Sequence, residues 1–132
     1  MLQYMLDTNI CIYVMKNYPH RLRERFNRLA EQLCISTITL GELYYGAEKS
    51  ARRVDNLQAI ENFTARLEVL PFGRDAAAHY GQIRASLQSV GRPAGAYDMM
   101  IGGHARSAAL VLITNNLREF ERIEGLRVEN WV

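Results

Sequence analysis

Short apolar runs alternate with longer segments of helical character along this chain, and this alternation limits the possible folds more than any other feature. The runs cover residues 2–6, 33–35, 67–70 and 110–113, with a weaker one at 126–128. The segments between them predict helices over residues 10–16, 20–30, 37–50, 54–66, 75–90, 97–108 and 117–121. Strands that alternate with helices favour an α/β fold with a mainly parallel central sheet of about five short strands, flanked by helices on both faces.

Polar residues stand directly after three of these apolar runs. Asp7-Thr8-Asn9 follows the first run, Ser36-Thr37 follows the second, and Thr114-Asn115-Asn116 follows the fourth. Asp, Ser and Thr are preferred at helix N-caps, so the first two groups predict the start of a helix. The carboxyl ends of parallel strands are also where α/β proteins bind ligands. We therefore expect a functional site near Asp7 and residues 114–116.

The composition fits one globular domain over residues 1–132. Hydrophobic residues make up 48% and charged residues 23% of the chain, which excludes a disordered protein, and the net charge of +2 permits a nucleic-acid partner without requiring one. Cys11 and Cys34 lie among apolar residues, as buried thiols do in a reducing compartment. No apolar run is long enough to cross a bilayer and Asp7 interrupts the first one, so we expect a cytoplasmic protein without a signal peptide.

Three acidic residues each stand alone in an otherwise apolar or neutral stretch. Asp7 is the only charged residue in positions 1–15, Glu42 the only one in 32–47, and Asp98 the only one in 93–105. A carboxylate buried without a partner is costly unless it is hydrogen-bonded, paired or bound to a metal. None of the three has an Arg or Lys at helical spacing in its own stretch. A shared Mg²⁺ or Mn²⁺ ion, which prefers oxygen ligands, is their natural compensation.

Each acid also has a simpler structural interpretation. Asp7 and Asp98 could cap the helices that begin beside them, and Glu42 could point into solvent. Near the fourth run, Asn115 and Asn116 could ligate a metal or orient water, or they could form only a turn. One shared metal site explains all three acids together, whereas the structural interpretation needs a separate reason for each.

At these residues the sequence resembles the PIN-domain ribonucleases and, within them, the VapC toxins. Four ordered motifs carry the resemblance: Met5 to Asn9 with Ile12-Tyr13, Ile35 to Leu43 with Gly46-Ala47, Tyr97-Asp98 with Ile101 and Ala105, and Thr114 to Asn116 with Glu119-Phe120. The ending Asn130-Trp131-Val132 is also similar to the family. The motifs span the whole chain in the family's order, and four in order are far more specific than one.

The resemblance implies a Mg²⁺- or Mn²⁺-dependent endoribonuclease in which Asp7, Glu42 and Asp98 hold the cation and Glu119 takes part in catalysis. Metal-activated water would hydrolyse the phosphodiester and leave a 5′ phosphate and a 3′ hydroxyl. The residues expected to orient the acids and their waters are Thr8, Asn9, Thr114 and Asn116. Asn116 stands where many PIN domains have an Asp, which puts a second metal site in doubt.

The resemblance also implies partners. A VapC toxin is held inactive by a cognate VapB-type antitoxin, which is expected to insert a segment near the acid pocket. The substrate would be a structured RNA of translation, with tRNA favoured and initiator tRNA as one candidate. We further expect a homodimer, no membrane partner, and contact with operator DNA only through the antitoxin.

Other chemistries fit the sequence less well. A metal-free ribonuclease needs paired histidines, and His20, His79 and His104 form no evident pair. Aspartate-nucleophile phosphatases need a second Asp where Asn9 stands, and a receiver domain needs a Lys after a late strand, where none occurs. A catalytically degenerate PIN-like binding module without RNase activity stays open as the alternative, because of Asn116.

RNA binding would require exposed basic and aromatic side chains. Basic residues cluster on the second predicted helix and elsewhere: Arg21, Arg23, Arg25, Arg28, Arg52, Arg53 and Arg92. Tyr44, Tyr45 and Tyr97 lie beside the site acids in sequence and could stack on flipped-out bases. An ordinary solvated helix face and ordinary core or rim aromatics explain the same residues equally well.

Overall fold

The sheet has five strands, all parallel, in the order β3-β2-β1-β4-β5. The computed structural model describes residues 1–92 and 94–132, so Pro93 of the predicted 91–95 loop lies outside the described residues. The strands are β1 (Tyr4–Leu6), β2 (Leu33–Ser36), β3 (Glu68–Leu70), β4 (Val111–Ile113) and β5 (Val128–Glu129). The predicted parallel sheet is confirmed, although its edge strand begins at Val128 rather than at Leu126.

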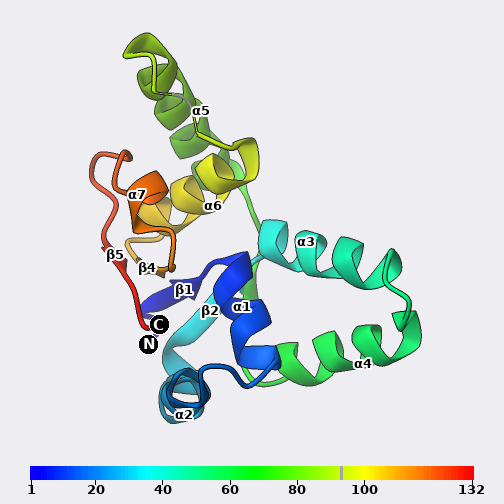
Figure 1. Cartoon of the computed structure of the whole chain (residues 1–132). Helices are drawn as coiled ribbons and strands as arrows, with labels where there is room; N and C mark the ends of the chain where they lie inside the picture. The colour runs from blue at the N-terminus through cyan, green and yellow to red at the C-terminus, as the bar shows by residue number, and fades with distance from the viewer. Residues whose placement is uncertain (93) are drawn as a thin grey trace.

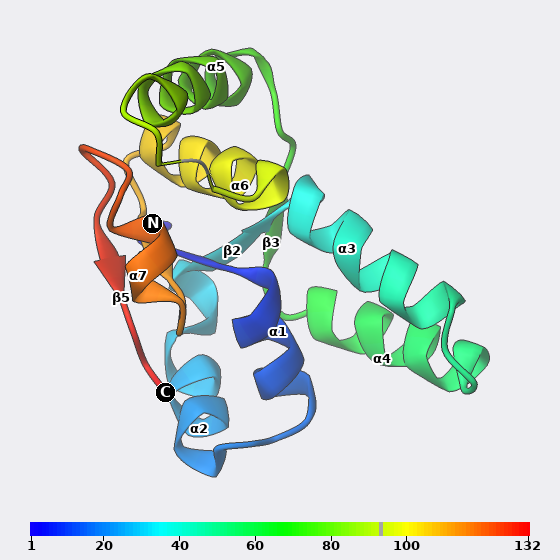
Figure 2. The same cartoon turned by 45° about the horizontal axis from the view of Figure 1, so that its top comes forward.

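Helices connect the parallel strands and lie on both sides of the sheet (Figures 1 and 2). They are α1 (Thr8–Met15), α2 (His20–Leu29), α3 (Thr37–Glu48), α4 (Arg53–Thr64), α5 (Arg74–Ser89), α6 (Ala96–Ser107) and α7 (Leu117–Phe120), with a single 3₁₀ turn η1 (Ala30–Gln32) after α2. The α3–α4 hairpin projects from the sheet, whereas α6 packs on the sheet and α5 lies beyond α6 (Figures 1 and 2). Each predicted helix is present, and its ends lie within two residues of the expected range.

The sheet separates two hydrophobic cores because successive side chains of a strand point to opposite faces. Leu6, Ile35 and Ile113 pack with residues of α1 to α4, whereas their neighbours Met5, Cys34 and Leu112 pack with residues of α5 to α7. Both faces of the sheet are therefore covered. Strands buried on both faces read as continuous apolar runs rather than as alternating ones, which explains the pattern in the sequence.

The position of α6 depends on its close approach to α5. A Cβ atom at Gly103 would lie 2.9 Å from the backbone N and 3.1 Å from the Cα of Tyr80. Arg106 also ties the two helices together, since its Nε donates to His79 Nδ1 at 3.0 Å. No helix in the part of the chain that the structure describes combines the length and the apolar character needed to cross a membrane.

Candidate active site

Asp7 lies directly after β1, at the carboxyl edge of the sheet. It is 5% exposed, and its Oδ1 accepts the N–H of Ile10 at 2.9 Å, so it caps α1. Burial raises the pKa of Asp7 and the charge of Glu42 adds to this, while hydrogen bonds from the Thr114 hydroxyl and the Ile10 N–H oppose the shift. Asp7 therefore caps α1, as its simpler interpretation predicts, and it also lies within electrostatic reach of Glu42.

Glu42 reaches the same region from α3, because Ser36 at the end of β2 caps this helix and sets its start. The Ser36 Oγ accepts the N–H of Ile38 at 3.0 Å. Glu42 is partly buried, and its Oε1 accepts a hydrogen bond from Thr8 Oγ1 at 2.5 Å. The Thr8 hydroxyl also lies 3.5 Å from Thr39 Oγ1. The carboxylate of Glu42 is thus held by the first residue of α1.

Asp98 comes from the first turn of α6 and is partly buried. Gly95 is the N-cap of this helix and no side chain makes a capping hydrogen bond there, so the capping interpretation of Asp98 is wrong. Burial raises the pKa of Asp98 to about 6, and the charges of Asp7, Glu119 and Glu42 add to the shift. Asp7, Glu42 and Glu119 therefore all lie within electrostatic reach of Asp98.

Glu119 belongs to α7, which follows β4. Its Oε2 lies 3.8 Å from a terminal nitrogen of Arg122, and both side chains are 24% exposed. Glu119 is therefore the one acid of the group with an ion pair in the described part of the chain. Its charge also helps to raise the pKa of Asp98, which places it within electrostatic reach of the other acids.

The polar residues expected around the acids differ in what they contact. The Thr8 hydroxyl binds Glu42 and the Thr114 hydroxyl binds Asp7. Asn116 donates its backbone N–H to Thr114 Oγ1 at 2.9 Å, and its side chain is exposed. The backbone N–H of Asn9 acts on Asp7, while the Asn9 side chain is also exposed. Threonine hydroxyls and backbone amides, rather than asparagine side chains, hold the acids.

The donor atoms of this region suit a hard divalent cation. Asp7, Glu42, Asp98 and Glu119 offer only carboxylate oxygens, and the first three make no ion pair among residues 1–92 and 94–132. No three acidic, His or Cys side chains of the described residues are spaced as direct ligands of one ion. The arrangement fits an ion such as Mg²⁺, which keeps several of its waters and is usually bound directly by one or two carboxylates.

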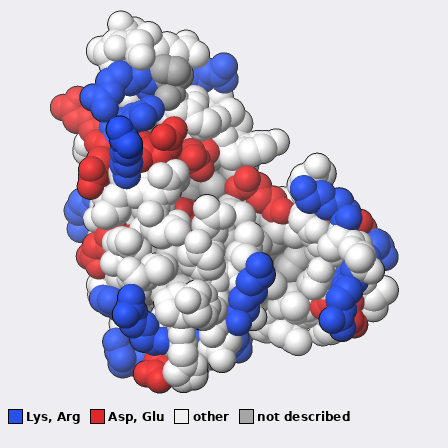
Figure 3. Space-filling view, in the orientation of Figure 1, with Lys and Arg blue, Asp and Glu red and all other residues white. Residues whose placement is uncertain are grey.

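Acidic side chains form a band across the middle of the face shown in Figure 3, with Lys and Arg side chains mostly around it. Part of the predicted RNA-binding basic surface serves the fold instead. Arg23 donates to the carbonyl of Val14 at 3.0 Å, and the Arg25 guanidinium lies 4.3 Å from the centre of the Trp131 ring. Arg52 and Arg53 pair with nearby acids, which leaves Arg21, Arg28 and Arg92 exposed.

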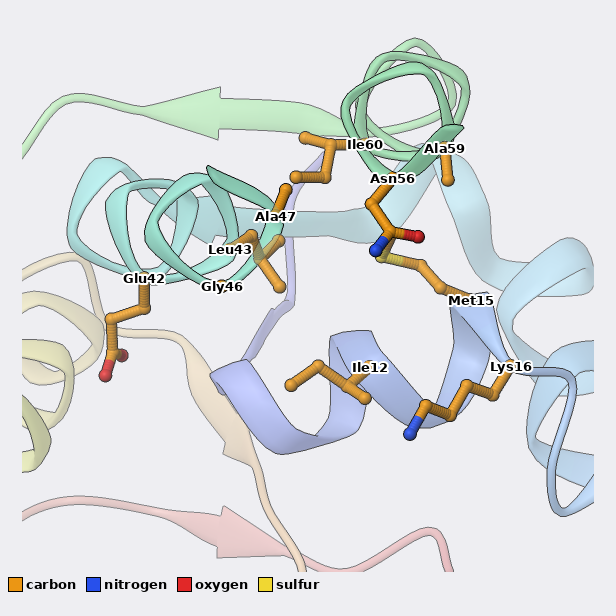
Figure 4. A pocket seen from close by; sticks show the side chains of 10 residues that line it. All are labelled: Ile12, Met15, Lys16, Glu42, Leu43, Gly46, Ala47, Asn56, Ala59 and Ile60. Atoms are coloured by element: carbon orange, nitrogen blue, oxygen red, sulfur yellow. The ribbon is translucent and has the colours of Figure 1, made fainter. Parts of the chain in front are cut away.

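A largely apolar groove of about 340 Å³ lies between α1 and the α3–α4 hairpin (Figure 4). Its lining consists of Ile12, Met15, Lys16, Glu42, Leu43, Gly46, Ala47, Asn56, Ala59 and Ile60. Glu42 stands at one end and Lys16 at the other (Figure 4). The groove therefore begins at the acid cluster and ends at a basic side chain.

The tyrosines and histidines named from the sequence fall in different places. Tyr97 is 58% exposed beside Asp98, and Tyr44 and Tyr45 are exposed on α3. His20 pairs with Glu24 on the surface and His79 accepts from Arg106, so neither is placed for catalysis. His104 is buried, with its Nδ1 2.8 Å from Ser36 Oγ. Sequence reasoning missed this last contact, since nothing in the sequence joins two residues 68 positions apart.

Comparison with known proteins identifies relatives along the whole length of the chain. The PIN domain family model matches residues 4–126. The chain is 58% identical over 131 residues to a protein of Salmonella typhimurium described as tRNA(fMet)-specific endonuclease VapC, and the match covers 99% of both chains. It is 52% identical over 132 residues to ribonuclease VapC2 of Haemophilus influenzae, with 100% of both chains covered.

Solved structures show the same likeness in three dimensions. The DNA-bound VapBC structure from Salmonella typhimurium contains a chain that superposes with a TM-score of 0.96 at 57% identity, covering 100% of both chains. The VapBC2 structure from Rickettsia felis, bound to a promoter DNA fragment, gives a TM-score of 0.93 at 37% identity, covering 99% of this chain and 100% of that one.

Proposed function

This chain belongs to the PIN domain family and to its VapC ribonucleases, and from that premise we propose that it is the toxin of a type II toxin–antitoxin pair and cleaves initiator tRNA. The observation that carries the proposal is the meeting of Asp7, Glu42, Asp98 and Glu119 in one region at the strand ends. The identity of 58% to a tRNA(fMet)-specific endonuclease supports the choice of substrate. Translation RNA is cytoplasmic, so the proposed place of action is the cytoplasm.

We propose that Asp7, Glu42 and Asp98 hold a Mg²⁺ or Mn²⁺ ion, directly or through water. PIN-domain nucleases as a class depend on divalent metal, and these acids have no cationic partner among the described residues. An RNA phosphate would be repelled by such a group of carboxylates unless positive charge stood between them. When bound, the cation supplies an acidified water and neutralises charge on the phosphate.

The chain's own residues would then organise the hydrolysis. The Thr8 hydroxyl orients Glu42, whose carboxylate is placed to accept the proton of the attacking water. The Thr114 hydroxyl and the Ile10 N–H fix Asp7. The water oxygen bonds to phosphorus, the bond to the 3′ oxygen breaks, and that oxygen leaves as a hydroxyl with a proton from solvent. The products carry a 5′ phosphate and a 3′ hydroxyl.

The groove between α1 and the α3–α4 hairpin is the proposed seat of an antitoxin segment. It is largely apolar, it opens beside Glu42, and relatives of this chain have been solved as VapBC complexes. A segment lying there would reach the acids and exclude RNA from them. Operator DNA would be bound by the antitoxin, and a toxin homodimer is part of the proposal.

The test is cleavage of initiator tRNA by the purified protein, with an elongator tRNA as the comparison substrate. Cleavage should require Mg²⁺ or Mn²⁺, should stop with EDTA, and should be lost in Asp7→Asn. Asp75→Asn, at an exposed position on α5, is the matched control and should cut like the wild type. Intact initiator tRNA with metal-loaded, folded wild type would favour the degenerate binding module instead.

A further inference from the structure

In the part of the chain that the structure describes, His104 and Ser36 form a buried polar pair that takes no direct part in the proposed reaction. His104, on α6, is 5% exposed and Ser36, at the end of β2, is fully buried. The His104 Nδ1 lies 2.8 Å from Ser36 Oγ. Burying two polar side chains is costly unless they are hydrogen-bonded to each other, and this pair satisfies that condition.

The Ser36 hydroxyl has two roles at once. Its Oγ accepts the N–H of Ile38 at 3.0 Å and so caps α3. Because that bond uses the oxygen as an acceptor, the hydroxyl proton is available for Nδ1 of a neutral imidazole. Burial lowers the pKa of His104, which favours this neutral form. One hydroxyl therefore joins the start of α3 to the last turn of α6.

The surroundings of His104 hold its ring in place. The Phe72 ring lies edge-on to the imidazole, with centroids 5.6 Å apart and planes at 86°. The backbone N–H of Phe72 donates to Thr37 Oγ1 at 3.0 Å, so the segment after β3 is tied to the first residue of α3. The contact between His104 and Ser36 is thus part of a packed junction of three chain segments.

The two helices joined at this junction carry two of the site acids. Ser36 precedes Glu42 by six residues and His104 follows Asp98 by six residues. Six residues of helix extend about 9 Å, so a shift of either helix at the junction reaches its acid through less than two turns. Leu43 and Ala47 of α3 pack in one core, whereas Met99 and Ala105 of α6 pack in the other, and α3 reaches that second core only near its start, through Ile38. The junction at Ser36 and His104 therefore lies where the two helices approach each other.

We propose that His104 is a positioning residue, which through its hydrogen bond to Ser36 sets the distance between Glu42 on α3 and Asp98 on α6. This inference rests on the proposed metal-dependent function. The hydrogen bond acts before any substrate arrives, so it governs how well the acids bind the cation. Loss of residues that orient metal ligands costs about tenfold or more in metal affinity and activity.

Two amide substitutions at His104 distinguish a role in positioning the acids from a role in filling space in the core. His104→Asn places a polar atom near the position of Nδ1 and keeps a partner for Ser36, whereas His104→Gln places it near Nε2 and leaves Ser36 without one. Both variants replace the ring with an amide of similar polarity, and the Gln variant additionally loses the hydrogen bond to Ser36, so it should be the less stable of the two. Thermal unfolding shows whether each is folded before it is compared.

The readouts are Mn²⁺ affinity, from the paramagnetic resonance signal of free Mn²⁺, and kcat and KM for tRNA cleavage. We expect His104→Gln to bind Mn²⁺ about tenfold more weakly and to lose about tenfold in kcat with little change in KM, while His104→Asn stays within about threefold of the wild type. Equal behaviour of the two variants, or a Gln variant like the wild type, would overturn the positioning role. A wild type that neither binds Mn²⁺ nor cuts tRNA would instead refute the proposed function.

Discussion

Thr8 Oγ1 lies 2.5 Å from Glu42 Oε1, so the helix after β1 holds the carboxylate that the helix after β2 presents. Thr8→Val keeps the shape of the side chain and removes this hydrogen bond. We expect kcat for tRNA cleavage to fall about tenfold, because a freed Glu42 no longer points at the reacting groups. Thr8→Ser keeps the hydroxyl and should stay within about threefold of the wild type. Single-turnover cleavage at saturating Mn²⁺ checks this, and a fully active Val variant would contradict it.

Asp98→Asn should make the metal-free protein more stable while it abolishes cleavage. The pKa of Asp98 rises from 3.8 to about 6 because of burial and three neighbouring acids, so its ionised form destabilises the fold at a pH well above 6. The shift corresponds to about 3 kcal/mol, and solvent screening of this partly exposed group lowers the expected gain to about 1 kcal/mol. Urea unfolding in EDTA measures the gain, and Asp75→Asn is the control. If Asp98→Asn lowered the free energy of unfolding instead, the claim that burial and the neighbouring acids destabilise the ionised Asp98 carboxylate would be wrong.

Cation affinity should fall as the pH drops below about 6, because a proton competes for the Asp98 carboxylate. The folded-state pKa of Asp98 is raised, so the stability it contributes in the metal-free protein is full below pH 3.8 and is lost as the pH rises through about 6. We expect the Kd for Mn²⁺ to weaken about tenfold per pH unit below about 6 and to level off above about 7. The same Kd on both sides of this range would show that Asp98 does not bind the ion.

Gly103→Ala should destabilise the protein by about 2–3 kcal/mol, because the new Cβ would meet backbone atoms of Tyr80 at 2.9 and 3.1 Å and would push α6 away from α5. Gly81→Ala is the matched control on α5, since a Cβ there has no neighbour within 4 Å. That change should stabilise the protein by about 0.5–1 kcal/mol through helix propensity. Thermal unfolding of the two variants gives opposite shifts if the close approach of α5 and α6 is as described.

Ala59→Arg should release the toxin from its antitoxin without harming the nuclease. Ala59 lines the groove between α1 and the α3–α4 hairpin and is partly exposed. A long charged side chain there would therefore block an apolar antitoxin segment without entering the core. We expect tRNA cleavage by the variant alone to be unchanged, and the concentration of VapB antitoxin needed for inhibition to rise at least about tenfold. Ala85→Arg, exposed on α5, is the control. If the antitoxin inhibited the Ala59→Arg variant as well as the wild type, the antitoxin would have to bind a surface other than this groove.

The backbone of the site was predictable from local patterns. The apolar runs set the strands, and Asp7 and Ser36 set the starts of α1 and α3 because short polar side chains after a strand cap helices. Lone carboxylates in apolar stretches pointed to Asp7, Glu42 and Asp98, and all three reach one region. These patterns are local in the sequence, so they can be recognised without knowing which segments pack together.

The contacts between distant segments were not predictable in the same way. Arg25 reads as a solvated helix residue, yet it lies over the Trp131 ring near the end of the chain. His104 reads as one more polar residue on a helix, yet it meets Ser36 at the end of β2. A periodic pattern shows which face of a helix is apolar but says nothing of the partner that each polar side chain meets.

The strand order has a consequence for the timing of toxicity during synthesis. The central strand β1 pairs with β2 on one side but with β4 on the other, and Tyr4 lies opposite Val111. A nascent chain that has reached residue 90 already carries Asp7 and Glu42 but has neither Asp98 nor the second neighbour of β1. The acid cluster is therefore incomplete for most of translation. The chain can cleave tRNA only after its C-terminal part has been synthesised and β4 has paired with β1.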